Sequence, residues 1–382
     1  MRNIVGQTPR GTDFFKRSAI IKKIYRRLEA GNHIFLSAPR RAGKTSIMRF
    51  LEDNPQEGYA FIYINTEDVD DLEDFFRLLS EELLDSEAAK KMTQLVESSK
   101  GLFAAFTEKI TKIKLWDLEV QLKQGEPSTY KDEFQDLLKK LNTRKFTIVI
   151  MLDEFPVTLE KIHKKHGEYQ AVHFLHCNRA LRQEANQGIQ FIYTGSIGLA
   201  SIASKLNATA ALNDLNVLEI PPLSTAEARR FTARLLKAYN VKFEDGSIDY
   251  LLSKLQWLMP FFIQLVVQVL IDEYETRRKT IDQKFIDQAI EKSSTHRNHL
   301  YFVNYYTRLE KSLPPEEAKV AKKILLEIAN KTEVPLDAFE EHPHSRRILE
   351  MLILDGYINN NQNAYRFNSP ILRDWWKKYG KD

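Results

Sequence analysis

One segment of the sequence has the residue types of a phosphate-binding loop. Residues 38–46 read APRRAGKTS and lie between the apolar run 33–37 and a helical pattern. Backbone N–H groups at a helix start can hold an anion, while a lysine there bridges the β- and γ-phosphates and the next hydroxyl ligates Mg²⁺. We therefore expect Lys44 to contact phosphate and Thr45 to contact the metal. The residues expected to bind the nucleotide are Ala38, Pro39, Arg40, Arg41, Ala42, Gly43, Lys44, Thr45 and Ser46.

The loop departs from the usual pattern at its first position. Ala38 stands where the motif has glycine. Alanine is small and Pro39 fixes a turn, so the loop can still close if the backbone of Ala38 avoids a positive φ. For a Gly-Lys-Thr motif taken alone, an accidental match at a helix start is the alternative interpretation.

Two acids provide the second half of the same chemistry. Residues 146–152 form a nearly continuous apolar strand that is followed at once by Asp153 and Glu154. Ligands of open α/β sheets bind at the carboxyl ends of the strands. We expect Asp153 to hold Mg²⁺ through water and Glu154 to act as the general base toward the attacking water. A helix cap after a strand is the structural alternative, but it does not explain the pairing with the Gly-Lys-Thr loop.

A third strand ends in hydroxyl side chains. Residues 190–193 are followed by Thr194-Gly195-Ser196, and the end of this strand should lie beside the acid pair. Thr194 and Ser196 could then position the γ-phosphate or the attacking water. Ordinary turn chemistry accounts for the same residues if the other motifs are ignored.

The elements that must position these residues alternate along the chain. Residues 1–222 alternate strands with helices, which predicts a P-loop core with a doubly wound parallel sheet, the α/β class. Residues 112–122 alternate in two phases and are expected to form an edge strand or a strand pair. The expected strands are 33–37, 59–64, 146–152, 190–193 and 217–220, and the helices between them include 16–30, 71–84 and 130–141.

The pattern becomes helical after residue 222. Helices are expected at 225–239, 248–255, 261–274 and 281–291, and we assign residues 223–300 to a helical lid. Residues 301–382 show three helical patterns, then a short hairpin around the polar turn 359–363, which is the outline of a winged-helix domain. Trp375 and Trp376 are expected on a closing helix, with one ring inward.

Composition narrows the classes of protein. The 382 residues carry 56 Lys and Arg against 52 Asp and Glu, so the net charge of +4 is too small to force nucleic-acid binding. A single cysteine, Cys177, excludes an intrachain disulfide framework and fits a reducing compartment. The longest apolar stretch, 261–271, is too short for a membrane span, and residues 1–11 lack the apolar core of a signal peptide. We expect a cytoplasmic protein with no membrane association.

At the residues quoted above the sequence resembles a known family. The blocks RRAGKTS (40–46), LDEF (152–155), YTGSIG (193–198) and LEIPPLSTAEA (218–228) look like the archaeal and bacterial P-loop ATPases of the STAND class, relatives of AAA+ proteins and origin-recognition initiators. The segment FFKRSAIIKKI (14–24) also resembles the family, with Arg17 at a common arginine. The resemblance covers about residues 13–275 and departs at Ala38 and around Met259.

The resemblance implies ATP rather than GTP as the nucleotide, a helical lid, and a conformational switch controlled by the nucleotide. It also implies an arginine that neutralises transition-state charge, which in such proteins can come from a neighbouring subunit of a homo-oligomer. Arg179 and Arg182 lie on the helix before strand 190–193, where relatives carry this residue. A solvated helix face is the alternative. For Arg40 and Arg41, nucleotide contact and pairing with a nearby carboxylate both stay open.

Four histidines and the cysteine crowd residues 163–177. Their spacing would allow a metal site on one helix face, but Gly167 interrupts the helix, and a packed or solvent-facing cluster is the favoured interpretation. The residues are His163, His166, His173, His176 and Cys177.

The winged helix has two candidate partners. Its helix 342–354 begins with His342, His344, Arg346 and Arg347 and could enter a DNA groove, with Arg366 and Arg373 on phosphates. Glu350, Asp355 and the asparagines of the wing favour a protein partner instead. The sequence therefore predicts an Mg²⁺-dependent ATPase that acts as a switch. The alternatives are a slow nucleotide-gated module that binds DNA or protein and, less favoured, a phosphoryl transferase.

Overall fold

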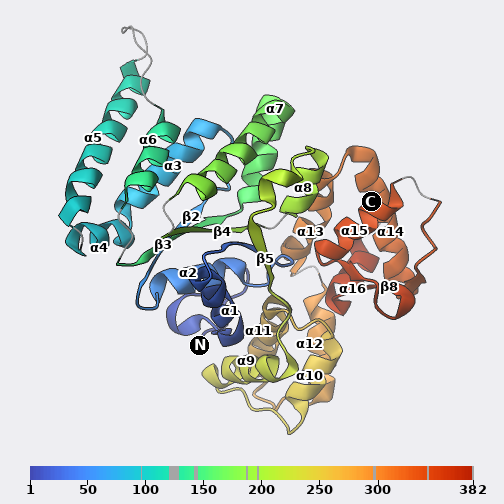
Figure 1. Ribbon diagram of the computed structural model, residues 1–382. Coiled ribbons are helices and arrows are strands. Elements are labelled where there is room, and N and C mark those ends of the chain that lie inside the picture. The colour runs from blue at the N-terminus through green and yellow to red at the C-terminus, as the bar shows by residue number, and fades with distance from the viewer. Residues whose placement is uncertain are drawn as a thin grey trace. The chain divides into compact units, whose positions relative to one another are not determined.

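The protein is described here by a computed structural model. It describes residues 1–95, 97–119, 129–141, 145–185, 188–195, 198–295, 298–341 and 344–380. The chain divides into two compact units (Figure 1). We call Lys16–Ser37 with Ile47–Glu219 the sheet unit, and Met1–Phe15, Ala38–Ser46 and Ile220–Asp382 the helical unit.

The sheet unit is built on a five-stranded sheet in the order β2-β3-β4-β1-β5, and all neighbouring strands are parallel. Parallel strands share one carboxyl edge, so β1, β3 and β4 end on the same side, with β4 between the other two. Apolar, nearly fully buried strands are what a parallel sheet covered on both faces requires. The strands are β1 (His33–Ser37), β2 (Tyr59–Asn65), β3 (Thr147–Asp153), β4 (Ile189–Thr194) and β5 (Leu215–Glu219).

Helices cover both faces of this sheet (Figure 1). On one face, Ile62 of β2 belongs to a buried cluster with α3, α5, α6 and α7. On the other face, Phe61 packs edge-on against Tyr25 of α1, with ring centroids 5.8 Å apart. This confirms the doubly wound α/β core. The helices are α1 (Ser18–Glu29), α2 (Lys44–Asp53, whose first turn belongs to the helical unit), α3 (Leu72–Asp85), α4 (Glu87–Leu95), α5 (Glu97–Glu119), α6 (Tyr130–Lys140), α7 (Phe155–Glu184) and α8 (Leu199–Lys205).

The strand expected at residues 112–122 is wrong as far as residue 119, because those residues belong to the long helix α5; residues 120–122 lie outside the described part of the chain. The buried side chains Phe103, Phe106, Ile110 and Ile113 recur every three or four residues, which is helical spacing. Leu115, which suggested alternation, is 53% exposed. The helical period begins nine residues before the segment that we interpreted as a strand.

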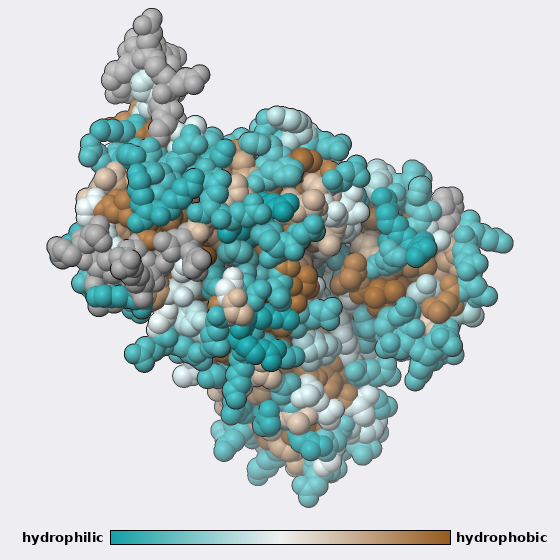
Figure 2. All heavy atoms as spheres, viewed as in Figure 1, coloured by the Kyte–Doolittle hydropathy of each residue, from teal (hydrophilic) through white to brown (hydrophobic). Residues whose placement is uncertain are grey.

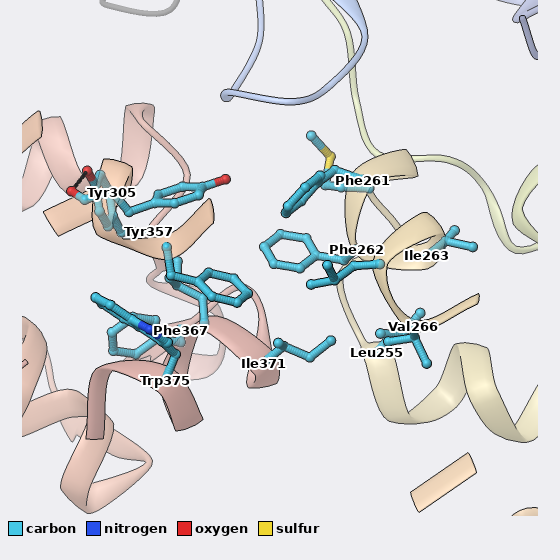
Figure 3. Close-up of a cluster of buried hydrophobic side chains, with 14 of the residues drawn as sticks. Leu255, Phe261, Phe262, Ile263, Val266, Tyr305, Tyr357, Phe367, Ile371 and Trp375 are labelled. Atoms are coloured by element: carbon cyan, nitrogen blue, oxygen red, sulfur yellow. Dashed lines mark hydrogen bonds between the residues drawn. The ribbon is translucent and has the colours of Figure 1, made fainter. Parts of the chain in front are cut away.

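In the described part of the helical unit, eight α-helices follow β5, and their buried apolar side chains belong to one cluster. Figure 3 shows Phe262 and Val266 of α11 in the same buried cluster as Tyr357 and Trp375 of the C-terminal segment. Helix α9 begins with a capping box, in which Ser224 and Glu227 satisfy each other's backbone N–H groups. The helices are α9 (Thr225–Ala238), α10 (Ser247–Leu255), α11 (Pro260–Arg277), α12 (Gln283–Ser293), α13 (His299–Ser312), α14 (Pro315–Lys331), α15 (Ser345–Leu354) and α16 (Pro370–Tyr379).

The C-terminal segment adds a small antiparallel sheet in the order β6-β8-β7, formed by Glu333–Pro335, Ala364–Phe367 and Ile358–Asn359. The hairpin of β7 and β8 lies where the sequence predicts it, whereas β6 was not anticipated. Both Trp375 and Trp376 are buried, at 1% and 0% exposure, so the expectation that only one ring faces inward is wrong. Both indoles therefore help to fix α16 to the helical unit.

Hydrophilic side chains cover most of the visible face of the molecule, and hydrophobic groups on that face occur in separate small patches (Figure 2). None of the helices in the described ranges combines the length and the apolar character that a membrane crossing requires.

Candidate functional site

The loop 38–46 follows β1 directly in the chain and runs into α2. Arg41 and Gly43 take left-handed backbone conformations, with φ of 63° and 90°. Ala38 does not, which is the condition that the sequence set for closing the loop without a first glycine. Ala42 is buried in the apolar core of the helical unit, and this packing anchors the loop to that unit.

Lys44 is folded back onto its own loop. Its Nζ donates to the carbonyl oxygens of Ala38 at 2.9 Å and Pro39 at 3.2 Å, and the residue is 7% exposed. An ammonium group held by carbonyl oxygens sits in a pocket of partial negative charge, and phosphate oxygens would replace those acceptors with stronger ones. In this structure the Lys44 ammonium is therefore held within its own loop by main-chain oxygens.

Arg41 stacks on aromatic rings. Its guanidinium carbon lies 3.9 Å from the ring centroid of Phe261 and 5.2 Å from that of Tyr301. Burial lowers the pKa of Arg41. The left-handed backbone of a non-glycine residue costs about 1–2 kcal/mol, and cation–π contacts of this kind can offset about as much. Neither alternative considered for Arg41 predicted this contact, which ties the loop to α11 and α13.

The acid half of the site lies in the sheet unit at the end of β3. Asp153 is 3% exposed, and its Oδ2 accepts a hydrogen bond from the Tyr63 hydroxyl at 2.9 Å. Its Oδ1 accepts from the Glu154 N–H at 3.1 Å, and its carbonyl accepts from Thr66. Thr158 of α7 in turn donates to Thr66. Asp153 is thus held by donors from β2 and from the start of α7.

Glu154 has a strained backbone, with φ of 58° at the N-terminal cap of α7. Glu154 is thus the N-cap residue of α7, as the helix-cap alternative has it, but its side chain makes no capping hydrogen bond. For a residue other than glycine, this left-handed conformation costs about 1–2 kcal/mol. The half-buried carboxyl of Glu154 follows directly after the fixed carboxyl of Asp153.

The end of β4 lies between the ends of β1 and β3. The Thr194 hydroxyl is buried and donates to the Leu36 carbonyl of β1 at 3.1 Å, so it braces two strands in the described conformation. Gly195 follows β4 in the chain and packs against the first turn of α7. A Cβ at this position would lie 2.3 Å from Pro156 Cδ, which explains why the residue is a glycine. Ser196, the other hydroxyl named by the sequence, lies outside the described residues.

The two candidate arginines on α7 differ sharply. The Arg182 side chain is 1% exposed and bonds bidentately to Asp214, at 2.6 and 2.8 Å, as well as to the hydroxyl of Tyr193. Burial by itself lowers the pKa of Arg182. Tyr193 and Asp214 raise this pKa by more than burial lowers it, so the guanidinium stays charged. The sequence offered Arg182 as an arginine that neutralises transition-state charge. In the structure its guanidinium forms an ion pair with Asp214 within the sheet unit, so we assign it a structural role. Arg179 is half-buried and donates to the Ala210 carbonyl at 2.6 Å.

Two residues after α15 approach the loop within the helical unit. A Cβ on Gly356 would lie 2.7 Å from Pro39 Cβ and 3.0 Å from Trp257, so glycine is required there. Asp355 is 8% exposed and pairs with Arg308 at 3.3 Å. Burial raises the pKa of the Asp355 carboxyl, while Arg308, Lys44 and Arg40 favour its charged form. The sequence identified Asp355 only as a charge unfavourable to DNA.

The basic residues that the sequence offered for DNA contact pair with acids. Arg346 bonds to Glu350 at 3.3 Å, and Arg373 bonds to Asp374 at 2.8 Å. The same holds for two further pairs, Arg347 with Glu317 and Arg366 with Glu333. His342 lies outside the described residues. These ion pairs reduce the positive charge that a DNA face would need.

The histidine group on α7 forms no metal cage. Gly167 interrupts the helix with φ of 85°, as expected. Among the described residues, no group of three or more His, Cys, Asp or Glu side chains is placed to hold a metal ion. His173 lies 3.4 Å from the buried Cys177, and His166 faces Asp71 at 3.3 Å.

The sequence did not identify Tyr63, Asp214 or Asp355 as functional or structural partners. Tyr63 reads as one apolar residue of a buried strand, and its contact with Asp153 joins positions 90 residues apart. The sequence holds no local signal for such pairs. Only the expected adjacency of the two strands could have pointed to Tyr63.

The comparisons with known proteins agree with this geometry at the level of fold. No protein-family model matches the sequence, and no curated protein matches it. A Walker-type ATPase of Pyrococcus abyssi superposes with a TM-score of 0.66 at 16% identity, covering 99% of this chain and 100% of that chain. The ORC2 protein of Aeropyrum pernix, in ADPNP and ADP complexes, superposes with a TM-score of 0.54 at 13% identity, covering 95% and 91%. At these identities the likeness shows the fold alone: this chain has the parallel-sheet fold of the Walker-type ATPase and of the ORC2 protein.

Proposed function

We propose that this protein binds ATP with Mg²⁺ at the carboxyl edge of its parallel sheet and hydrolyses it. The strand order carries this proposal. β1 leads into the loop of Lys44, β3 ends in Asp153, and the two strands are parallel and separated only by β4. A triphosphate at that edge would meet both motifs.

The loop would hold the phosphates. Lys44 would exchange its bonds to the carbonyls of Ala38 and Pro39 for oxygens of the β- and γ-phosphates, and the N–H groups of residues 40–45 would surround them. Ser46 and Thr45 follow in the first turn of α2. The nearby stack of Arg41 on Phe261 would keep the loop in place during the exchange.

The acid half fits a magnesium ion. Mg²⁺ prefers oxygen ligands and keeps several of its waters, and the Asp153 carboxylate is buried at a strand end with both oxygens oriented by N–H or O–H donors. Thr45 and, through water, Asp153 would hold the ion. When bound, Mg²⁺ neutralises charge that develops on the phosphate oxygens.

Glu154 would accept the proton of the attacking water as the general base. Its strained backbone places the carboxyl one residue beyond the fixed metal ligand. Thr194, which braces β1 and β4, would act by keeping the strand ends in register, and Ser196 stays a candidate for the γ-phosphate. Arg179 is the better candidate for an arginine supplied to a neighbouring copy in a homo-oligomer, because Arg182 is already engaged with Asp214.

The switch is the second element of the proposal. We assign residues 1–222 to a P-loop core, 223–300 to a lid and 301–382 to a winged-helix domain, as in the STAND-class ATPases that the sequence resembles. Arg41, Gly356 and Asp355 would transmit the occupancy of the loop to the lid and the C-terminal helices, since they share one packed unit with it. A working place in the cytoplasm, where ATP is plentiful, fits this function.

A slow nucleotide-gated module that engages a partner is the alternative function. The ion pairs of Arg346, Arg347, Arg366 and Arg373 favour a protein partner over DNA for the C-terminal module.

Steady-state phosphate release with ATP and Mg²⁺, in the presence and absence of duplex DNA, tests these proposals. Turnover without DNA supports the ATPase. Binding without turnover supports the gated module, and stimulation by DNA that falls with salt would restore DNA as the partner. Absence of ATP binding would contradict the proposed function itself.

A further inference from the structure

The hydroxyl of Tyr63 is aimed at the proposed metal ligand. Tyr63 lies on β2, is 7% exposed, and donates to Asp153 Oδ2 over 2.9 Å. The phenol O–H is the donor of this bond, and the Asp153 carboxylate is the acceptor. The bond is buried, where a charge-assisted hydrogen bond is strongest.

Two residues of α2 fix the tyrosine in turn. The guanidinium carbon of Arg49 lies 3.5 Å from the Tyr63 ring centroid, and Arg49 bonds to Glu52 Oε2 at 2.8 Å. Glu52 Oε1 accepts the backbone N–H of Tyr63 at 3.1 Å. The Tyr63 ring is therefore held in one orientation by α2, the helix that follows the phosphate loop.

We propose that Tyr63 is a positioning residue for the metal: its hydrogen bond fixes the orientation of the Asp153 carboxylate, which would accept from the waters of Mg²⁺. The inference rests on the proposed function and deepens it. Partners that hold a ligating carboxylate typically alter metal affinity by about 10- to 100-fold when they are removed. Because Asp153 is expected to act through water, the lower end of this range applies.

Packing is the competing explanation, and the chain offers a matched control for it. Tyr59 lies on the same strand, packs edge-on against Tyr25 at 5.1 Å, and sits at the opposite end of β2 from Asp153. Tyr59→Phe and Tyr63→Phe remove the same atom from the same strand. Only Tyr63→Phe removes the bond to Asp153, while it keeps the ring beneath Arg49.

The test uses Mn²⁺ with ADPNP, an ATP analogue that resists hydrolysis, and follows free Mn²⁺ by electron paramagnetic resonance. Tyr63→Phe should raise the dissociation constant of Mn²⁺ in the ternary complex by about tenfold, whereas Tyr59→Phe should leave it unchanged. Binding of ADPNP in EDTA should match the wild type in both variants, which also reports that the variant is folded. In an Asp153→Asn background, Tyr63→Phe should add no further loss.

The outcomes separate two failures. If the wild-type chain binds no ADPNP with Mn²⁺, the proposed function fails before Tyr63 is tested. If the wild type binds and Tyr63→Phe has wild-type Mn²⁺ affinity, the role of Tyr63 is refuted while the nucleotide site stands. A loss that persists undiminished in the Asp153→Asn background would also refute it, because Tyr63 would then act through another group.

Discussion

The two halves of the candidate site are held in different ways. In the sheet unit, Asp153 accepts bonds from Tyr63 and from the Glu154 N–H, and its strand is buried on both faces. In the helical unit, Lys44 bonds to carbonyls of its own loop, and the loop is secured by apolar packing and by the stack of Arg41. The acid half is held by donors from its surroundings, whereas in the proposed function the loop half would exchange its own carbonyl oxygens for those of phosphate.

This difference indicates in which half of the site the free energy of nucleotide binding would drive a conformational change. A rigid acid edge lowers the reorganisation needed for catalysis. A loop that releases its own contacts on binding can transmit a signal to the elements that pack on it, which here are α11 and the C-terminal segment of the same unit. Substitutions in the loop half and in the acid half should therefore impair different properties of the protein.

The most far-reaching effect is expected in the loop half, because without nucleotide binding no later step can occur. Lys44→Ala removes the ammonium that would hold the phosphates, and ATP affinity should fall by about 100-fold or more. Isothermal titration calorimetry with ATP and Mg²⁺ measures this. Lys22→Ala, an exposed lysine on α1, is the control and should bind normally. Normal binding by Lys44→Ala would place the nucleotide elsewhere.

In the acid half, Glu154→Gln should keep ATP binding and reduce kcat by about 100- to 10,000-fold, because the amide cannot accept the proton of water. Single-turnover phosphate release measures it, with Glu168→Gln on the exposed part of α7 as the control. Wild-type turnover by Glu154→Gln would show that another group is the base.

The two arginines of α7 sharpen the account of the fixed half. Arg182→Ala leaves Asp214 without its partner, and the free energy of unfolding should fall by about 3 kcal/mol in urea titrations. Arg179→Ala should change stability by less than about 1 kcal/mol. If Arg179→Ala lowers turnover only at concentrations where copies associate, it is the arginine supplied between subunits. Equal loss of stability in both variants would contradict the distinction.

A pair of glycines tests how tightly the loop half is packed. Gly356 and Gly246 have the same left-handed backbone, with φ of 81° and 80°, but only a Cβ on Gly356 would meet Pro39 and Trp257. Each Gly→Ala change costs about 1–2 kcal/mol of backbone strain, and Gly356→Ala should cost about 1–3 kcal/mol more. Thermal unfolding compares them. Equal losses would mean that the contact with the loop is unimportant for stability.

The smallest effect concerns pH. His33 accepts the Phe191 N–H on Nδ1, its Nε2 faces the Arg182 carbonyl, and burial, with the charge of Arg182, lowers its pKa. The unfolded chain then binds the extra proton first, so stability should fall as pH drops through about 6.5, the value in the unfolded chain. Urea titrations on either side of that pH measure it. His33→Gln should flatten the dependence, and the exposed His163→Gln should not.

The sequence predicted the elements whose patterns are long and local. The apolar strands 33–37 and 146–152, the loop 38–46 and the helices of the lid follow from periodicity and motif spacing. The strand prediction for the α5 segment was wrong because the alternation of apolar residues over 112–119 overlaps a helical period that begins at Phe103. Three-residue β6 is too short to carry any period.

The polar partners of the site were beyond prediction for another reason. Tyr63 with Asp153, Arg182 with Asp214, and Asp355 with Arg308 are pairs that only the tertiary fold brings together. A tyrosine in an apolar strand and an arginine on a helix have the same local patterns whether or not they meet a carboxylate. The motif residues could be named as candidates from the sequence, but the side chains that hold them in place could not.

The central claim is that Lys44 and Asp153 serve a single triphosphate. A crystal structure of the complex with ADPNP and Mg²⁺ tests it most directly. The account predicts that the Lys44 ammonium leaves the carbonyls of Ala38 and Pro39 for phosphate oxygens, with the Asp153 carboxylate on the waters of the same nucleotide's metal. A nucleotide held by the loop with Asp153 out of reach of its metal would contradict it.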